Sequence, residues 1–291
     1  MMMHNQPGTT ITAYLSRKGI VRLVLLVPLF VYTLFAAGPF LWTAILSLRK
    51  TPEIYQNPYG LPTTFDLSHY VEAFTDFGYA LYMRNSLIVT IGALILITLS
   101  ASMAAYIFAR ARFNFPLREP LFLLIFLTIM FPPQIMILAL FQILIKIKLY
   151  NTHLGLILVY AATELPLAIY LLRAFYAQIP QEIEDAARID GCSDFTLFRK
   201  VMFPIARPAV STVLVLNLIR FWNEFLYASV LITKKDIRTL PLAIMFFMGE
   251  QYQDVGMLAT GLMISSLPII ILYVFLSEQF IKGMTAGALK M

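Results

Sequence analysis

Long apolar segments separated by short polar ones dominate the chain. A helix needs roughly 20 mostly apolar residues to cross a bilayer, and six segments reach that length. Strands that cross a membrane would instead give short segments in which apolar and polar residues alternate. The pattern therefore predicts an all-α integral membrane protein with six transmembrane helices. The predicted spans are residues 20–48, 85–109, 120–143, 154–176, 208–232 and 257–280.

Two local patterns add detail to this outline. The third predicted span contains Pro132-Pro133, and a proline inside a helix removes a backbone donor and clashes with the preceding turn. We expect a kink or break there, with a structural role. Between the first two spans, Val71, Phe74 and Phe77 recur at helical spacing, which predicts a short amphipathic helix at the membrane interface.

The composition excludes a soluble protein. Hydrophobic residues make up 59% of the 291 residues and charged residues only 13%, too few for the surface of a soluble domain. The formal net charge of +6 raises nucleic acid as a partner, but the distribution of the basic residues argues against it. With the amino terminus in the cytoplasm, thirteen of the 22 Lys and Arg residues lie inside, eight lie outside in longer loops, and Arg220 lies within a span. This asymmetry predicts that both termini are cytoplasmic.

The predicted organisation follows from these spans. A cytoplasmic segment 1–19 precedes a six-span domain 20–282, and a cytoplasmic tail 283–291 follows it. The six-span domain includes a polar loop at residues 177–207. The first span is too long for a cleaved signal peptide and lacks a small-residue cleavage site.

The sequence offers little for catalysis or metal binding. The single Cys192 excludes an intramolecular disulfide. His4, His69 and His153 are far apart and lack the spacing of metal ligands. We therefore expect no catalytic residue and no metal site on this chain.

The polar loop 177–207 separates the fourth and fifth spans. A helix is expected to begin after Pro180, because acidic residues, Glu184 and Asp185 among them, fall in its first turns, where the helix dipole favours negative charge. Gly191 falls where a left-handed cap would end that helix. The loop therefore begins as a helix that stops in a tight turn.

A second short helix is expected after the turn. Ser193 is suited to cap its first turn. Pro204 would end it, and Pro208 would lie in the first turn of the fifth span. The two helices together predict a helix-turn-helix, for which an ordinary interfacial amphipathic hairpin is the alternative. One face of the second helix would carry Phe195, Phe198 and Met202.

The spacing within this loop resembles the cytoplasmic coupling loop of bacterial ABC importer permeases. That loop is written E-A-A, three residues, G, nine residues, I, one residue, L-P. Here Asp185-Ala186-Ala187 fills the triplet, Gly191 follows after three residues, and Val201-Met202-Phe203-Pro204 follows after nine more. Asp for Glu, Val for Ile and Phe for Leu are conservative departures.

Three further segments extend the resemblance over nearly the whole chain. They open the second span, lie in the fifth span and form the carboxy-terminal tail. The chain thus resembles the second permease subunit of carbohydrate ABC importers of the maltose-transporter type, which are multi-pass proteins of the bacterial inner membrane. The segments are Asn85-Ser86-Leu87-Ile88-Val89-Thr90, Phe221-Trp222-Asn223-Glu224-Phe225 and residues 282–290.

The resemblance implies a division of labour. Two six-span permeases would form the translocation pathway, two P-loop ATPase subunits would bind ATP and Mg²⁺, and an extracytoplasmic binding protein would deliver the carbohydrate. The chain itself has no G-x-x-x-x-G-K-[ST] sequence, so no cofactor is expected on it. Oligosaccharides, monosaccharide derivatives and glycerol phosphates are all carried by similar subunits, and the sequence does not choose among them.

The resemblance also implies how the permease is coupled to the ATPase. The first helix of the loop would dock in a cleft of the ATPase, where the small Ala186 and Ala187 allow close approach. Asp185 or Glu184 would pair with a basic residue of that partner. The predicted coupling residues are Glu184, Asp185, Ala186, Ala187, Gly191 and Pro204.

Five polar side chains lie within predicted spans, where an ionised group is costly unless it is paired or hydrated. Arg220 and Glu224 are four residues apart, at a spacing that lets them neutralise each other on one helix, and Asn217 shares their face. Two interpretations stay open: the wall of a water-filled sugar pathway, or a salt bridge and hydrogen bonds that hold the two permeases together. The candidate pathway residues are Glu164, Asn217, Arg220, Asn223 and Glu224.

Two other functions compete with an ABC permease. A proton-coupled secondary transporter would relay protons through Glu164 or Glu224, but it would give no reason for the spaced loop. An intramembrane enzyme would need a catalytic constellation, and the sequence offers none. The ABC importer permease is therefore the function that the sequence predicts.

Overall fold

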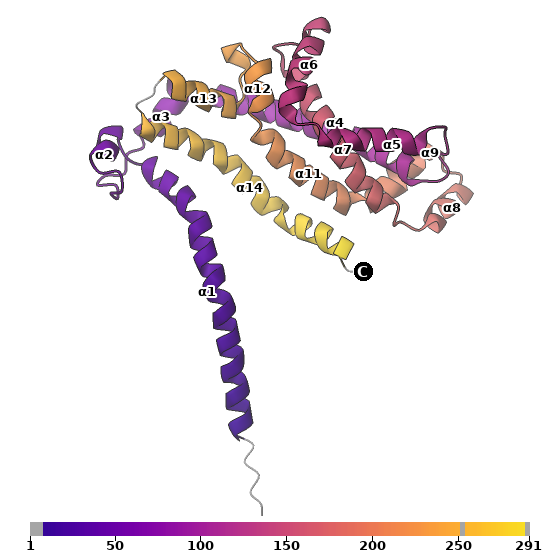
Figure 1. The fold of residues 1–291 in the computed structure, drawn as a ribbon, viewed down its shortest axis with the longest axis horizontal. Coiled ribbons are helices and arrows are strands. Elements are labelled where there is room, and N and C mark those ends of the chain that lie inside the picture. The colour runs from indigo at the N-terminus through magenta and orange to yellow at the C-terminus, as the bar shows by residue number, and fades with distance from the viewer. Residues whose placement is uncertain (1–7, 251–253, 289–291) are drawn as a thin grey trace, which may run out of the picture. The chain divides into compact units, whose positions relative to one another are not determined.

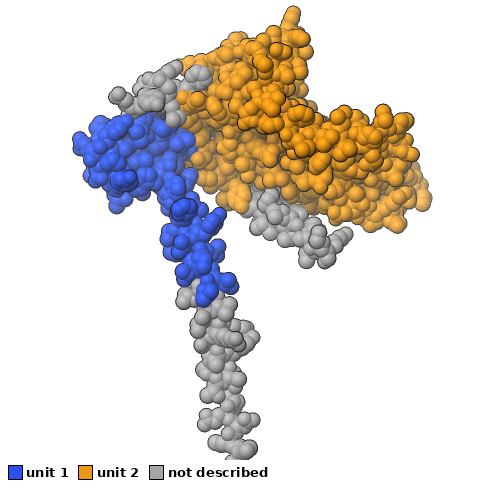
Figure 2. Space-filling view, in the orientation of Figure 1, with its two compact units in different colours: residues 1–70, 253–263 blue, residues 71–252, 264–291 orange. Residues whose placement is uncertain are grey.

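The computed structural model describes the backbone of residues 8–250 and 254–288, and the side chains of residues 24–245 and 254–274. Within these ranges every regular element is a helix (Figure 1), which confirms the predicted all-α class. The chain divides into two compact units, residues 1–70 with 253–263 and residues 71–252 with 264–291 (Figure 2). His4 and residues 289–291 of the predicted tail lie outside the described residues.

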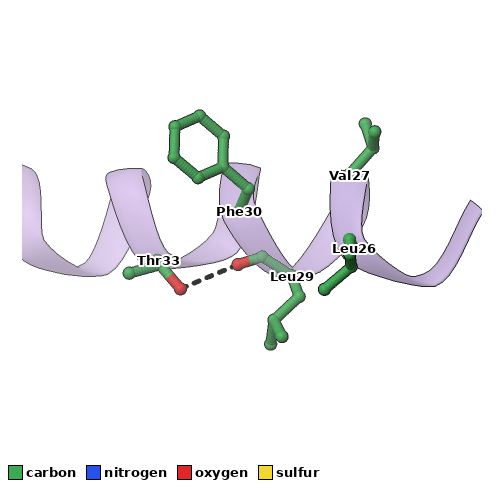
Figure 3. A pocket seen from close by; sticks show the side chains of 5 residues that line it. All are labelled: Leu26, Val27, Leu29, Phe30 and Thr33. Atoms are coloured by element: carbon green, nitrogen blue, oxygen red, sulfur yellow. Dashed lines mark hydrogen bonds between the residues drawn. The ribbon is translucent and has the colours of Figure 1, made fainter. Parts of the chain in front are cut away.

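The first unit contains α1 (Gly8–Leu46), α2 (Thr51–Gln56) and the start of α14 (Val255–Ala288). Residues Val24–Leu46 of α1 are long and apolar enough to cross a membrane. The hydroxyl of Thr33 donates to the carbonyl of Leu29 at 2.8 Å (Figure 3), so this polar group is satisfied within the helix, as a bilayer requires. Around it α1 presents the apolar side chains of Leu26, Val27, Leu29 and Phe30 (Figure 3).

Polar contacts organise the segment that follows α1. Arg49 is almost fully buried and donates to the backbone carbonyls of Glu53 at 3.1 Å and Asn57 at 2.9 Å. Asp254, just before α14, accepts hydrogen bonds from the Thr51 hydroxyl at 2.5 Å and from the backbone N–H of Met257 at 2.8 Å. The segment between the first two predicted spans is therefore structured by its own polar groups.

The predicted amphipathic helix is present as α3 (Ser68–Thr75). Val71 and Phe74 lie on it with exposed side chains, whereas Phe77 lies beyond its end. The prediction of a helix is therefore confirmed for Val71 and Phe74, but it was wrong to include Phe77.

The second unit is built on α4 (Tyr79–Ala109) and α7 (His153–Tyr176), which pack along each other. The buried face of α4 carries small side chains, among them Ala93, Ala101 and Ala105, and small residues let membrane helices approach closely. A Cβ atom on Gly92 would lie 2.7 Å from Cδ1 of Ile157 on α7. The other helices of this unit include α5 (Arg118–Leu127), α6 (Pro133–Lys146), α11 (Arg207–Trp222), α12 (Leu226–Leu231), α13 (Leu240–Glu250) and the later part of α14.

The third predicted span is broken where the two prolines lie. After α5 and a short 3₁₀ turn, α6 begins at Pro133, and the two halves are bent by 109°. This confirms the expected break. By length and composition, four described helices can cross a membrane, or up to six if each bent pair counts as one span.

The fifth predicted span, 208–232, is wrong as a continuous helix. α11 ends at Trp222 and α12 begins at Leu226. The carboxylate of Glu224 accepts the backbone N–H groups of Tyr227 at 2.7 Å and Ala228 at 3.1 Å. These bonds cap the first turn of α12, so a side chain replaces the carbonyl partners that a continuous helix would have supplied.

Candidate functional site

The polar loop between α7 and α11 folds into two helical pieces joined by a tight turn. α8 (Gln181–Ile189) starts directly after Pro180, as predicted. Gly191 has a φ of +81°, which a residue with a Cβ adopts only at a cost. Its N–H donates to the carbonyl of Arg188 at 2.9 Å, and the N–H of Cys192 donates to that of Ala187 at 3.0 Å. This pair of bonds is a Schellman motif, so the predicted left-handed cap is confirmed.

The second piece begins at α9 (Asp194–Leu197), where the side chain of Ser193 accepts the N–H of Thr196 at 3.4 Å. This confirms the predicted cap. The helix then widens into a π-helix (Phe198–Met202) and continues as α10 (Phe203–Ile205). The helix ends at Ile205, one residue after Pro204, and the chain bends by 74° into α11, so Pro204 lies at the predicted end. Pro208 lies in the first turn of α11, as predicted.

The π-helix also changes which side chains share a face. Met202 and Leu197 are fully buried, but Phe195 is 63% exposed. The predicted common face of Phe195, Phe198 and Met202 is therefore wrong for Phe195. An i→i+5 turn shifts the angular register of the residues around it, and the sequence pattern assumed a regular α-helix.

One side of α8 and the turn is open to the surroundings. Asp185, Ala186 and Gly191 are exposed, and Ile189 is 87% exposed. Ile189 is four residues after Asp185, so this face of α8 presents an apolar and an acidic side chain together. We refer to Asp185, Ala186, Ile189, Gly191 and Phe195 as the exposed face of the loop.

Glu184 does not belong to that exposed face, although the sequence assigned it the same role as Asp185. It is 4% exposed and forms an ion pair with Arg110, which follows α4 and is 8% exposed. The hydroxyl of Tyr106 donates to the same carboxylate at 3.2 Å. Of these two acidic side chains, Asp185 is therefore the exposed one, while Glu184 holds α8 against the end of α4.

A second ionic contact fixes the same region. Both terminal nitrogens of Arg112 reach the carboxylate of Asp194 at the start of α9, at 2.8 and 3.0 Å. Arg188, at the end of α8, lies 2.8 Å from the same carboxylate. Such a bidentate arginine contact fixes orientation as well as distance. α8 and α9 are thus both tied to the segment that leaves α4.

The polar residues of the predicted spans form a different pair from the one expected. Arg220 on α11 contacts Glu164 on α7 at 2.5 Å, and the predicted Arg220–Glu224 pair is wrong. α11 ends at Trp222, so Glu224 is not one turn further along the same helix and instead caps α12. The side chain of Arg220 is 55% exposed and that of Glu164 is 21% exposed.

The two asparagines of this group also lie apart. Asn217 is buried, and its amide donates to the carbonyl of Val213 at 2.9 Å. Asn223 is exposed and donates to the carbonyl of Ile219 at 2.9 Å. The predicted common face of Asn217, Arg220 and Glu224 is therefore split between the core and the surface.

Sequence reasoning missed the residues that anchor the loop, namely Tyr106, Arg110, Arg112 and Asp194. The available signal was the position of Arg110 and Arg112 just after a predicted span, on the same side of the membrane as the loop. That placement limits where they lie but does not name their partners. Among the described residues no three His, Cys, Asp or Glu side chains are grouped as metal ligands would be.

Comparison with known proteins agrees with the family that the sequence resembles. A family model described as "Binding-protein-dependent transport system inner membrane component" matches residues 97–285. The arabinooligosaccharides transport system permease protein AraQ of Halalkalibacterium halodurans is 33% identical over 88% of this chain and 91% of its own length. The trehalose transport system permease protein SugB of Mycobacterium tuberculosis is 34% identical over 88% and 93%.

A solved structure has a similar fold. A chain from a bacterial ABC transporter involved in the import of the acidic polysaccharide alginate superposes with a TM-score of 0.76. The match covers 96% of this chain and 100% of that one, at 22% identity. The similarity therefore extends over nearly the whole fold.

Proposed function

The chain belongs to the family of binding-protein-dependent transport system inner membrane components, and we propose that it is a permease subunit of a bacterial ABC importer for a sugar or oligosaccharide. The observation that carries this proposal is the exposed face of the loop, which lies inside the segment matched by the family model. A permease without an ATPase of its own needs such a surface to receive mechanical work. The chain itself is not an enzyme in this proposal.

The exposed face docks on an ATPase subunit. Ala186 is small and exposed and permits close approach, with the half-buried Ala187 beneath it, and Asp185 is free to pair with a basic residue of the partner. Ile189 and Phe195 supply the apolar contact area, which in most interfaces gives more affinity than exposed charge pairs do. Gly191 and Pro204 shape the segment, and Glu184 fixes it from behind.

The complete importer contains a second six-span permease, two P-loop ATPase subunits that hold ATP and Mg²⁺, and an extracytoplasmic binding protein. The chain crosses the inner membrane with both termini and the loop 177–207 in the cytoplasm, which the excess of basic residues on that side supports. The exposed apolar side chains of α1 face lipid or the second permease.

The Glu164–Arg220 pair marks the translocation pathway. A half-exposed arginine on a membrane helix is costly if it faces lipid, so this pair faces water or the second permease. Asn223, which is also exposed, and Glu224 at the break between α11 and α12 lie near it along the chain. Hydroxyl-rich sugars are bound by such carboxylate, guanidinium and amide groups, and Asn217 supports the wall from inside.

Cross-linking tests the proposal. In a Cys192→Ser background, a cysteine that replaces Asp185 should cross-link to a P-loop ATPase, and a cysteine that replaces the exposed Tyr59 should not. The second permease and the ATPase should co-purify with both variants in mild detergent. Purification of the chain without any ATPase, or equal cross-linking from both positions, would contradict the proposed function.

A further inference from the structure

Both ends of α4 are fastened to segments that are distant in the sequence. α4 has 31 residues (Tyr79–Ala109), which corresponds to a length of about 46 Å. In Figure 1 it runs the length of the second unit, with α8 and α9 at one end and α13 at the other. Unlike the third and fifth predicted spans, it is not interrupted. It is therefore one of two long, continuous helices between these regions; the other is α7, whose His153 lies 3.2 Å from the carbonyl of Ile237.

The end of α4 beside α8 is held by one buried ion pair and one that is about half-exposed. Arg110 pairs with Glu184 of α8, and its Nη1 donates to the carbonyl of Ile179 at 2.9 Å. Arg112 holds Asp194 of α9. A buried ion pair with additional hydrogen bonds is geometrically demanding, so a displacement of α8 displaces the end of α4 with it.

The opposite end of α4 is held by two neutral side chains. The amide of Asn85 donates to the backbone carbonyls of Asp236 at 2.9 Å and Arg238 at 3.0 Å. The hydroxyl of Ser86 accepts the backbone N–H of Leu240 at 2.8 Å. Asn85 and Ser86 are both 2% exposed. Buried bonds of this kind are costly to leave unmade. The segment Asp236–Leu240, which leads into α13, is therefore expected to move together with this end of α4.

The middle of α4 is packed as a rigid element. Its buried alanines lie close against α7, and a Cβ atom on Gly92 would require the end of the Ile157 side chain to move. Closely packed interiors transmit displacements because they deform little. The distance along the helix from Asn85 to Arg110 is about 37 Å, which is enough to join the two sides of a membrane.

We propose that α4 transmits the state of the ATPase-docking loop to the segment Asp236–Leu240 on the outer side, and that Asn85, Ser86, Arg110 and Glu184 are positioning residues for this coupling. The inference rests on the proposed function, which places α8 in contact with the ATPase. Because coupling between two sites is reciprocal, events on the outer segment also reach the ATPase along the same helix.

A labelling experiment on the assembled complex tests the role of α4. Lys235 is exposed directly before the outer segment, and Lys235→Cys in a Cys192→Ser background provides a probe for an impermeant maleimide. The rate of labelling is compared with and without a non-hydrolysable ATP analogue and Mg²⁺ on the cytoplasmic side. We expect the nucleotide to change the rate by at least about 5-fold, the lower end of typical allosteric coupling.

Two variants remove the connection at opposite ends of α4. Glu184→Gln removes the charge that holds Arg110, and Ser86→Ala removes the acceptor for Leu240. Each should abolish the effect of the nucleotide on labelling, and the double variant should show no further change. Ser86→Thr, which keeps the hydroxyl, should restore it. Ser100→Ala is the matched control, because the Ser100 hydroxyl bonds only within α4, to the carbonyls of Leu96 and Ile97, and it should behave as the wild type.

Several results would overturn the role of α4. They are a nucleotide effect that persists in Glu184→Gln or Ser86→Ala, or a wild-type complex that binds the nucleotide analogue without any change at residue 235. The role of α4 would also be overturned if Glu184→Gln and Ser86→Ala failed to assemble with the partners while Ser100→Ala assembled normally. The contacts at the two ends of α4 would then be needed only for folding and assembly. A wild-type chain that binds no ATPase would instead contradict the proposed function.

Discussion

Replacing Gly191 by alanine tests the turn between α8 and α9 with a single added methyl group. Gly191 has a φ of +81°, and no atom lies within 4 Å of the position that a Cβ would take. The substitution therefore adds backbone strain without a steric clash. The left-handed conformation costs an L-residue about 1–2 kcal/mol.

This strain acts on the orientation of α8. The turn is held by the bonds from Gly191 to Arg188 and from Cys192 to Ala187, and a more negative φ at residue 191 would break them. Only molecules with the native turn then dock productively on the ATPase. The apparent affinity of the loop for the ATPase falls with the fraction of such molecules. Since about 1.4 kcal/mol corresponds to a factor of ten, we expect ATP-dependent uptake to fall by about tenfold.

The assay compares Gly191→Ala with Gly191→Asn in proteoliposomes that contain equal amounts of assembled complex. Asparagine tolerates the left-handed region better than alanine does, so Gly191→Asn should retain more uptake. Expression and membrane insertion should be normal for both, because the turn is exposed. Wild-type uptake in Gly191→Ala, or lower uptake in Gly191→Asn than in Gly191→Ala, would refute the reasoning from backbone strain.

Two further predictions concern the ion pairs and the topology. Glu184→Ala leaves Arg110 buried without its ionic partner and should cost about 3–5 kcal/mol, whereas Glu164→Ala should cost at most about 1 kcal/mol because Arg220 is half-exposed. Thermal unfolding of the two variants in detergent measures the difference, and equal losses would contradict it. In a Cys192→Ser background, a cysteine at Tyr59 should react with an impermeant thiol reagent added to intact cells, and one at Lys200 should not. Labelling at residue 200 from outside would contradict a cytoplasmic loop.

The features that the sequence predicted correctly depend on local geometry. Gly191 and Ser193 act on backbone groups within four residues, and Pro132-Pro133 interrupts the helix in which it lies. A turn, a cap or a break of this kind requires no knowledge of the rest of the fold. The same is true of the apolar segments, whose length alone predicts membrane helices.

The features that the sequence did not predict depend on contacts between distant segments. Glu164 and Arg220 are 56 residues apart, and Arg110 and Glu184 are 74 positions apart in the sequence, so no spacing rule connects either pair. The Arg220–Glu224 prediction was wrong because it assumed a continuous helix, although Asn223 and Glu224 in an otherwise apolar segment were a signal that the helix ends there. The π turn after α9 left no comparable signal in the sequence.

Arginines at the predicted cytoplasmic end of the spans also serve a structural role. Arg118 and Arg173 both donate to the carbonyl of Phe108 near the end of α4, and Arg173 also pairs with Glu119 at 3.0 Å. Counting basic residues predicts the side of the membrane. It does not reveal that their guanidinium groups join the ends of several helices.

The energy source for uptake tests the central claim most directly. The complex is reconstituted in proteoliposomes and supplied with its binding protein outside and ATP with Mg²⁺ inside, and uptake is measured for a panel of labelled sugars that includes trehalose and arabino-oligosaccharides. We predict that uptake of at least one sugar requires both ATP and the binding protein, and that it continues at an unchanged rate when an ionophore collapses the proton gradient. Uptake that stops when the gradient collapses but continues without ATP would contradict an ABC importer and favour a proton-coupled transporter that uses Glu164 or Glu224.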